Sequence, residues 1–261
     1  MTRLRMMAMV FSAIILAGSF ALSFPLSAEE EKNTINDIKY KIEDWDPRLL
    51  QMIELGPYYL SKTEDIIVMP PPANDSTETR AELDLLLKYQ AEARTSGEVE
   101  KIIAENIGRF DPMFSPKGTK MKEAVTLGVR EVDFFLMKAK KYYGRARPTQ
   151  LEPELTTVIP VPKHAAYPSG HGTQARMAAR ILTEIDPANK ESYEQYARDV
   201  AHRREVAGLH YPSDSKAGSD LADAVFEKLI QHPQYKKTLE AAKEEFKHNQ
   251  QSTSDTKKEE K

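Results

Sequence analysis

Apolar residues along most of this chain recur every three or four positions, the spacing of helices that bury one face. The longest such stretch runs from Thr119 to Tyr143, and it is followed by Gly144, a residue type that commonly ends helices in a left-handed conformation. Similar patterns predict helices over residues 172–185, 190–207 and 213–231, separated by Pro187, Gly208 and Pro212. Few segments alternate as strands do, so the pattern predicts an all-α fold.

Two further helix starts precede the long helix. The segment Thr79-Arg80-Ala81-Glu82 has the spacing of a capping box and comes directly before an apolar run. The segment Thr95-Ser96-Gly97-Glu98 repeats that arrangement before a second apolar run. Both patterns indicate helices between residues 79 and 107.

The flanking regions lack this periodicity. Residues 29–72 look irregular, because Trp45-Asp46-Pro47 and Met69-Pro70-Pro71-Pro72 favour an extended backbone. Residues 241–261 are polar and rich in charge, which is typical of a disordered tail. We therefore expect a single-domain multi-helix bundle over residues 73–240, with the irregular N-terminal segment packed on it.

The first 28 residues have the pattern of a secretory signal peptide. Arg3 and Arg5 form a short basic start, an uncharged run extends from Met6 to Phe24, and Ala28 supplies a small residue at the cleavage position. The pattern predicts export, to the periplasm or the medium. An uncleaved membrane anchor is the alternative, because the apolar run approaches the length that spans a bilayer.

Composition narrows the chemistry that this chain can perform. Its 261 residues include no cysteine, which excludes disulfides, thiolate metal ligands and a cysteine nucleophile. Lys and Arg number 37 against 40 Asp and Glu, so the net charge of −3 argues against a nucleic-acid partner held by bulk charge. Any catalysis must use histidines, carboxylates, hydroxyls and cations.

Two clusters supply cations and a possible anion-binding turn. Lys140 lies in the last turn of the long predicted helix, and Arg147 follows in a loop closed by Pro148. Further on, Pro168-Ser169-Gly170-His171 precedes a predicted helix. Gly170 permits close approach of the backbone to a ligand, Ser169 can donate a hydroxyl, and the helix start favours an anion. Taken singly, the first cluster could equally be a solvated basic helix end, and the second could equally be an ordinary turn that caps a helix.

A third cluster joins Arg204, His210 and Asp214. Gly208 and Pro212 place His210 at a junction between helices, and Asp214 can accept the proton on His210 Nδ1. The other ring nitrogen is then unprotonated, as a nucleophilic imidazole requires. A His–Asp pair that merely caps a helix is the alternative. The three clusters together favour a phosphate-ester site.

These residues resemble the tripartite signature of type-2 phosphatidate phosphatases and vanadium haloperoxidases, and within that superfamily the chain is similar to class A bacterial nonspecific acid phosphatases. The resemblance implies a helical bundle whose site lies among the interhelical loops. It differs from the usual pattern at Arg203, where the family often has serine, and at Ala165, Ala166 and Gly172 around the second cluster.

The resemblance also implies a role for each site residue. His210 would attack phosphorus, Asp214 would orient it, and His171 would protonate the leaving alcohol and later activate water. Phosphoryl oxygens would be bound by Lys140, Arg147, Ser169, Gly170 and Arg204, with no metal or other cofactor. Nearby His164, His202, Tyr142, Tyr143 and Tyr167 are interpreted singly as packing or surface residues, although the tyrosines could line a leaving-group pocket.

The leading functional hypothesis is therefore an exported, metal-independent acid phosphatase that acts through a phosphohistidine. Its partners would be small-molecule phosphomonoesters, with phosphate or vanadate as inhibitors, no nucleic acid, and possible self-association as in the family. The alternatives are a vanadate-dependent haloperoxidase, a lipid-phosphate phosphatase anchored by an uncleaved N-terminal helix, and a non-catalytic anion-binding protein.

Overall fold

The computed structural model describes residues 34–106 and 117–259, and within these ranges the regular structure is helical. The helices are α1 (Pro47–Leu55), α2 (Thr77–Ser96), α3 (Glu98–Asn106), α4 (Thr119–Tyr143), α5 (Pro148–Leu151), α6 (Gly170–Ile185), α7 (Lys190–Val206), α8 (Pro212–Leu229) and α9 (Pro233–Glu259). The predicted all-α fold is confirmed. The predicted signal peptide, residues 1–28, lies outside the described residues. In the described ranges, no helix combines the length and apolar character needed to cross a membrane.

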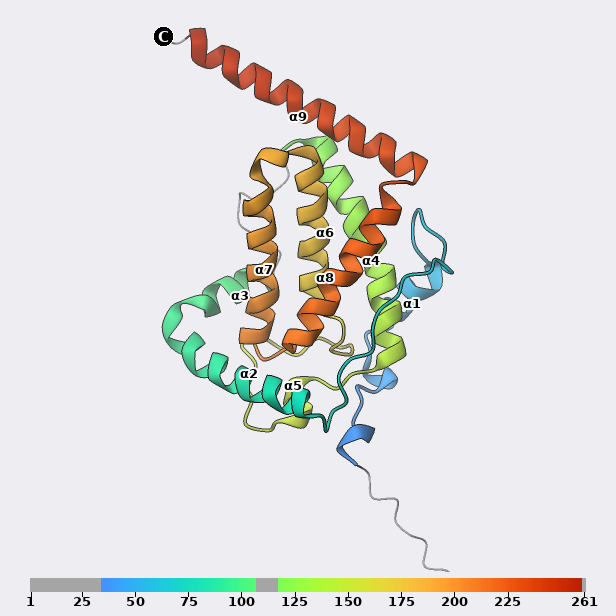
Figure 1. Cartoon of the computed structure of the whole chain (residues 1–261), viewed down its shortest axis with the longest axis vertical. Helices are drawn as coiled ribbons and strands as arrows, with labels where there is room; N and C mark the ends of the chain where they lie inside the picture. Colours follow the sequence, from blue (N-terminus) through green and yellow to red (C-terminus); the bar gives the residue numbers. More distant parts are fainter. Residues whose placement is uncertain (1–33, 107–116, 260–261) are drawn as a thin grey trace, which may run out of the picture. The chain divides into compact units, whose positions relative to one another are not determined.

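Four helices, α4, α6, α7 and α8, form a bundle with α6 in contact with the other three (Figure 1). Apolar side chains at helical spacing on each member meet in one continuous core. Buried residues of this core include Leu136, Met177, Ile181, Leu221, Val225 and Phe226. Burial of these side chains holds the helix ends in fixed relative positions, and those ends carry the signature residues.

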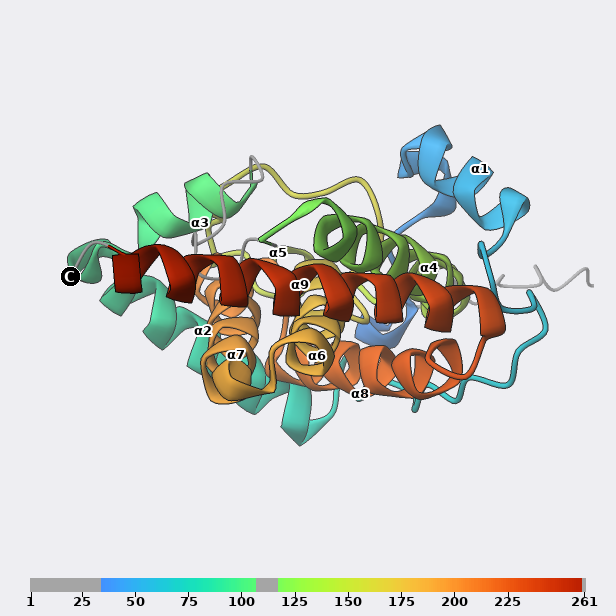
Figure 2. The ribbon, with the colours of Figure 1, turned by 90° about the horizontal axis from the view of Figure 1, so that it is seen from above.

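The direction of each helix brings the three sequence clusters to one end of the bundle. α4 and α7 finish at this end, whereas α6 and α8 begin there (Figure 1). α9 crosses the opposite end, over α4 and α6 (Figure 2). Clusters spread over the sequence from Lys140 to Asp214 therefore meet because they lie at the ends of neighbouring helices.

The helix boundaries at this end follow from glycine and proline. Gly144 ends α4 with φ 59°, as the sequence predicts. Gly208, after α7, has φ 72°, and a Cβ there would lie 2.8 Å from the carbonyl oxygen of Thr156, so a larger residue would both strain and crowd this turn. Pro212 opens α8, where its missing N–H costs nothing. The last residue of α7 and the first of α8 are thus fixed on either side of His210.

The start of α2 differs from the predicted capping box at Thr79. Ser76 is the N-cap, and its hydroxyl accepts the N–H of Thr79, one turn earlier than expected. Thr79 itself is buried, and its hydroxyl donates to the carbonyl of Ala73. The predicted second start is closer: Gly97, in a left-handed conformation, separates α2 from α3, which begins at Glu98.

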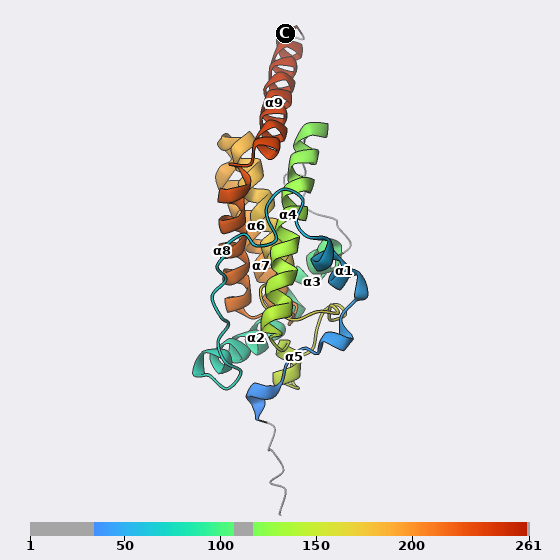
Figure 3. The ribbon, with the colours of Figure 1, turned by 90° about the vertical axis from the view of Figure 1, so that its right-hand side faces the viewer.

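The N-terminal segment is more ordered than the sequence indicated. Asp46 caps α1 through the N–H of Arg48, so the Asp-Pro pair begins a helix instead of only extending the chain. α1 lies against α4 (Figure 3). The buried Glu131 carboxylate of α4 accepts three successive backbone N–H groups, from residues 58–60. This side chain is one of several attachments of the segment to the bundle.

The predicted disordered tail over 241–261 is wrong for the residues described, because α9 continues to Glu259. The average composition of this segment does not reveal that α9 has a narrow apolar stripe. Leu239 and Ala242 are buried, and Phe246 packs on the core. Glu245 on the same helix accepts the N–H groups of residues 119–121, which have no acceptor within α4. Around this stripe, the polar residues that suggested disorder form the outer face of the helix.

Candidate active site

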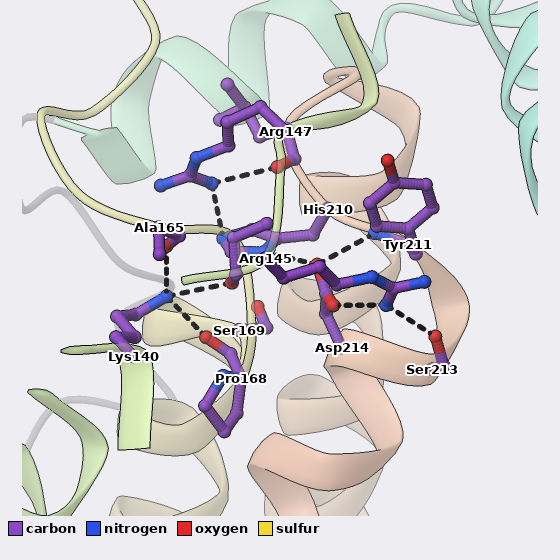
Figure 4. A network of polar contacts seen from close by, with 12 residues as sticks. Lys140, Arg145, Arg147, Ala165, Pro168, Ser169, His210, Tyr211, Ser213 and Asp214 are labelled. Carbon is purple, nitrogen blue, oxygen red and sulfur yellow. Dashed lines mark hydrogen bonds and ion pairs between the residues drawn. The ribbon is translucent and has the colours of Figure 1, made fainter. Parts of the chain in front are cut away.

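Asp214 lies at the centre of a buried hydrogen-bond network, and both of its carboxylate oxygens accept hydrogen bonds (Figure 4). Its Oδ2 atom is 3.1 Å from His210 Nδ1 and also accepts the N–H of Tyr211. Its Oδ1 atom accepts from Arg145 Nη1 at 2.6 Å. Burial opposes ionisation, yet Arg145 and the hydrogen bond with His210 lower the pKa of Asp214 to about 2. Asp214 is therefore an anion that holds the His210 ring in place.

The other nitrogen of His210 contacts a cation. Arg147 Nη1 lies 3.2 Å from His210 Nε2. A guanidinium only donates, so Nε2 must be the acceptor and the ring proton resides on Nδ1, facing Asp214. Burial, and then Arg147, lower the pKa of His210 well below its ordinary value, so the ring is neutral. This is the protonation state that a nucleophilic imidazole needs.

Arg147 is held on several sides by the loop that precedes the second cluster. Its Nε and Nη2 atoms donate to the carbonyl of His164, Nη2 also lies 3.1 Å from His164 Nδ1, and Nη1 donates to the carbonyl of Leu209. Burial lowers the pKa of Arg147 to about 10, and the group keeps its charge. His164, interpreted from sequence as a packing residue, packs edge-on against Trp45 and also holds Arg147.

Lys140 serves the same loop. Its ammonium donates to the carbonyls of Ala165, Ala166 and Pro168, which accounts for all three N–H bonds (Figure 4). Burial, and then Arg147, lower the pKa of Lys140 well below its ordinary value. In this arrangement Lys140 clamps the loop that leads into α6, and binding a phosphoryl oxygen would require redirecting one of the three N–H bonds.

Ser169 and Arg204 have the opposite character, because they keep buried donors without partners. Ser169 Oγ and Arg204 Nε and Nη1 are buried and have no hydrogen-bond partner within the described chain. Ser169 immediately precedes Gly170, the first residue of α6, whose leading N–H groups have no acceptor within the helix. The backbone N–H of Ser169 donates to the carbonyl of Asp214, which places this turn beside the His210 network. Such unpartnered donors at a helix start form a cradle for an anion.

His171 follows in the first turn of α6 and is partly exposed. Burial, and then the positive charge of Arg204, lower its pKa to about 4. Lys140 and Arg147 act in the same direction. An anion bound among these cations would reverse that effect and raise the pKa of His171, so this ring can be protonated in the presence of a phosphate group.

The structure adds residues that sequence analysis treated as ordinary. Arg145, which the sequence analysis did not single out, is buried and joins Asp214 to Ser213 and to Glu82 of α2. Its guanidinium also lies 3.8 Å from the ring centroid of Tyr211. Its position two residues before Arg147 was the only signal in the sequence, because Glu82 is 63 residues away.

The residues considered doubtful have structural roles. His202 is half-exposed beside Glu205 and Tyr89. The hydroxyls of Tyr143 and Tyr167 donate to the carbonyls of Val68 and Met69 and so hold the proline-rich segment. A cavity of about 200 Å³ beside Tyr143 contains none of the signature residues; it is lined by Glu64, Ile66, Val68, Phe135, Lys138, Ala139, Tyr142 and Tyr143.

Within residues 34–106 and 117–259, no three His, Asp or Glu side chains are arranged to hold a metal ion.

Comparisons with known proteins find similarity to acid phosphatases. No protein-family profile matches the sequence. The chain is 29% identical over 198 residues to the non-specific acid phosphatase of Salmonella typhimurium, covering 68% of this chain and 77% of the relative. It is 30% identical over 118 residues to the non-specific acid phosphatase of Providencia stuartii, covering 44% of this chain and 48% of the relative.

The fold is shared with known structures, one of which is a bacterial vanadium-dependent iodoperoxidase, with a TM-score of 0.53 and 16% identity over 67% of this chain and 55% of that one. The helical bundle is the fold of this solved structure, and the relatives that match in sequence are named non-specific acid phosphatases. The chain is therefore similar to members of the superfamily of type-2 phosphatidate phosphatases and vanadium haloperoxidases.

Proposed function

We propose that the protein is an acid phosphatase that hydrolyses small-molecule phosphomonoesters through a phosphohistidine at His210. The observation that carries this proposal is the set of buried, unpartnered donors on Ser169 and Arg204, together with a neutral His210 whose unprotonated Nε2 faces Arg147. Unpaired buried donors cost free energy unless a ligand completes them. A phosphoryl group has the charge and the acceptor oxygens to do so.

In the first step, phosphoryl oxygens accept hydrogen bonds from Arg204, Ser169 Oγ and the N–H of Gly170. Arg147 moves from His210 Nε2 to a phosphoryl oxygen, which uncovers the nucleophile. Nε2 attacks phosphorus as the bond to the leaving oxygen breaks, and His171 donates its proton to that oxygen. Asp214 stabilises the positive charge that develops on the His210 ring.

In the second step, neutral His171 takes a proton from water, whose oxygen attacks phosphorus. The N–P bond breaks, its electron pair returns to His210 Nε2, and inorganic phosphate leaves. Arginine charges and aligned donors offset the charge on the equatorial oxygens, which is the main requirement in phosphoryl transfer. We therefore expect no metal or other cofactor, no nucleic-acid partner, and inhibition by phosphate or vanadate.

The substrate class rests on the relatives, which are named non-specific acid phosphatases. The test is hydrolysis of p-nitrophenyl phosphate at acidic pH with excess EDTA, followed by acid-free quenching to trap phosphorylated protein. The expected result is hydrolysis of the ester and a trapped phosphoryl group on His210. Activity abolished by EDTA would contradict metal independence. Halide oxidation by vanadate-loaded protein, without hydrolysis of any phosphate ester, would identify a haloperoxidase instead.

We also propose that the protein is exported to the periplasm with removal of residues 1–28. The support is the basic start, the uncharged run and Ala28, all in the sequence. Intact-mass measurement of the exported protein should give a chain that begins at Glu29. A full-length, membrane-bound product would instead favour an anchored phosphatase that acts on lipid phosphates.

A further inference from the structure

Arg204 shares a buried carboxylate with its neighbour in sequence. Glu105, on α3, accepts from Arg204 Nη2 through Oε2 at 2.6 Å. Its other oxygen, Oε1, accepts from Arg203 Nε at 2.7 Å and lies 2.5 Å from Arg203 Nη2. All three side chains are nearly inaccessible to solvent. No sequence pattern suggested this trio, because Glu105 lies 99 residues before Arg204.

The carboxylate presents an electrostatic problem for the proposed function. A buried anion at hydrogen-bond distance would cancel most of the positive charge of Arg204, the residue whose unpartnered donors the proposed function assigns to phosphate. Arg203 removes that problem, since two guanidiniums and one carboxylate leave a net charge of +1. The next groups around Arg203 are Glu98, 3.9 Å away, and the ring of Tyr196, 5.6 Å away, so Glu105 is its principal partner.

We propose that Arg203 is a positioning residue that neutralises Glu105 and thereby keeps the charge of Arg204 available to phosphate. Glu105 in turn occupies only Nη2 of Arg204, which leaves Nε and Nη1 as the unpartnered donors. Arg203 acts through Glu105 and Arg204, and it need not touch the substrate. This inference rests on the proposed phosphate site.

The test is a double-variant cycle read by the inhibition constant of inorganic phosphate against p-nitrophenyl phosphate. Arg203→Gln should weaken phosphate binding about tenfold, because Glu105 then neutralises Arg204. Glu105→Gln should bind phosphate no more weakly than the wild type. The double variant should return to within about threefold of the wild type. Arg198→Gln, which removes an exposed charge from the same helix, should change nothing.

The recovery in the double variant separates charge compensation from a purely structural role. If Glu105 were needed to orient Arg204, the double variant would bind phosphate at least as weakly as Arg203→Gln, and the inference would be wrong. Melting temperatures measured beside each inhibition constant show which variants fold. If Arg203→Gln fails to fold, Glu105→Gln decides alone, since weaker phosphate binding in that variant overturns the inference.

Failure of the proposed function gives a different pattern. Wild-type protein that neither hydrolyses the ester nor binds inorganic phosphate in calorimetry would contradict the phosphate site itself, and the inference with it. Wild-type protein that is active and inhibited by phosphate, with all three variants unchanged, would contradict only the role of Arg203.

Discussion

The two sides of the candidate site are built on different principles. Around Asp214, both carboxylate oxygens are hydrogen-bonded and the charge is matched by Arg145. Around Ser169 and Arg204, three buried donor atoms have no partner in the described chain. The first side satisfies both oxygens of its buried carboxylate, as protein interiors do, and leaves only neighbouring atoms, Arg145 Nε, Tyr211 Oη and Ser215 Oγ, without a partner in the described chain. The second side leaves groups buried that a ligand could satisfy.

This difference separates residues that stabilise the fold from residues that are proposed to bind the substrate. An unsatisfied buried donor costs about 1–3 kcal/mol, so the second side lowers the stability of the protein. On the first side, the carboxylate of Asp214 carries no such cost, because both of its oxygens accept hydrogen bonds, and it fixes the tautomer and orientation of His210. A substitution on the Asp214 side should therefore mainly lower stability, whereas a substitution on the Ser169 side should mainly lower activity.

The largest effect is expected at His210, where the two sides meet. His210→Ala removes the proposed covalent step, so kcat for p-nitrophenyl phosphate should fall by at least about 10⁴-fold. His202→Ala, at a half-exposed histidine of α7, is the matched control and should retain activity. Substantial turnover by the His210 variant would show that the nucleophile lies elsewhere.

Ser169→Ala tests the unsatisfied side. Loss of one donor to the transferring phosphoryl group should lower kcat/KM about 10²-fold. The melting temperature should not fall, since the hydroxyl removed has no partner. Thr183→Val deletes another buried, unpartnered hydroxyl from the same helix and should leave activity unchanged. A large loss of stability in the Ser169 variant would indicate a partner in solution that supports the fold.

Arg145→Gln tests the side of the site around Asp214. This substitution should lower stability more, and activity less, than Ser169→Ala. Asp214 and Glu82 lose a buried countercharge, so the free energy of unfolding should fall by about 3 kcal/mol. Arg145 also depresses the pKa of Asp214, so the variant should lose activity at a higher pH on the acid side. Chemical denaturation and pH profiles measure both effects. Arg130→Gln, at an exposed arginine, is the control.

The smallest effect concerns pH and the position of His171 between the two sides. Its pKa of about 4 means that rising pH deprotonates the proposed acid in the free protein, so kcat/KM should decline above that value. A bound phosphate ester adds negative charge and raises this pKa, so kcat should persist to higher pH than kcat/KM. Coincident alkaline limbs would argue against His171 as the acid.

The sequence predicted the all-α fold because helical periodicity, glycine stops and Pro212 are local signals. It also grouped the three clusters before any geometry was known, since the resemblance specifies residues at the ends of helices. The tail was mispredicted because composition averages over both faces of α9 and so hides the stripe formed by Leu239, Ala242 and Phe246.

What the sequence could not predict is pairing between distant segments. Glu82 and Glu105 lie on helices that precede the signature, and nothing local to either marks it as a partner of Arg145 or Arg204. Lys140 shows a related difficulty. The sequence predicted that it belongs to the site, but only the loop geometry shows that its three N–H groups donate to backbone carbonyls.

The contact between Arg147 Nη1 and His210 Nε2 has a consequence for the end of turnover. On the proposed mechanism, the guanidinium and the phosphoryl group compete for the same ring nitrogen. Each cleavage of the N–P bond therefore returns to Arg147 an acceptor that it can bind in place of inorganic phosphate. Buried cations would otherwise retain inorganic phosphate. The return of Arg147 to His210 Nε2 therefore speeds the release of phosphate.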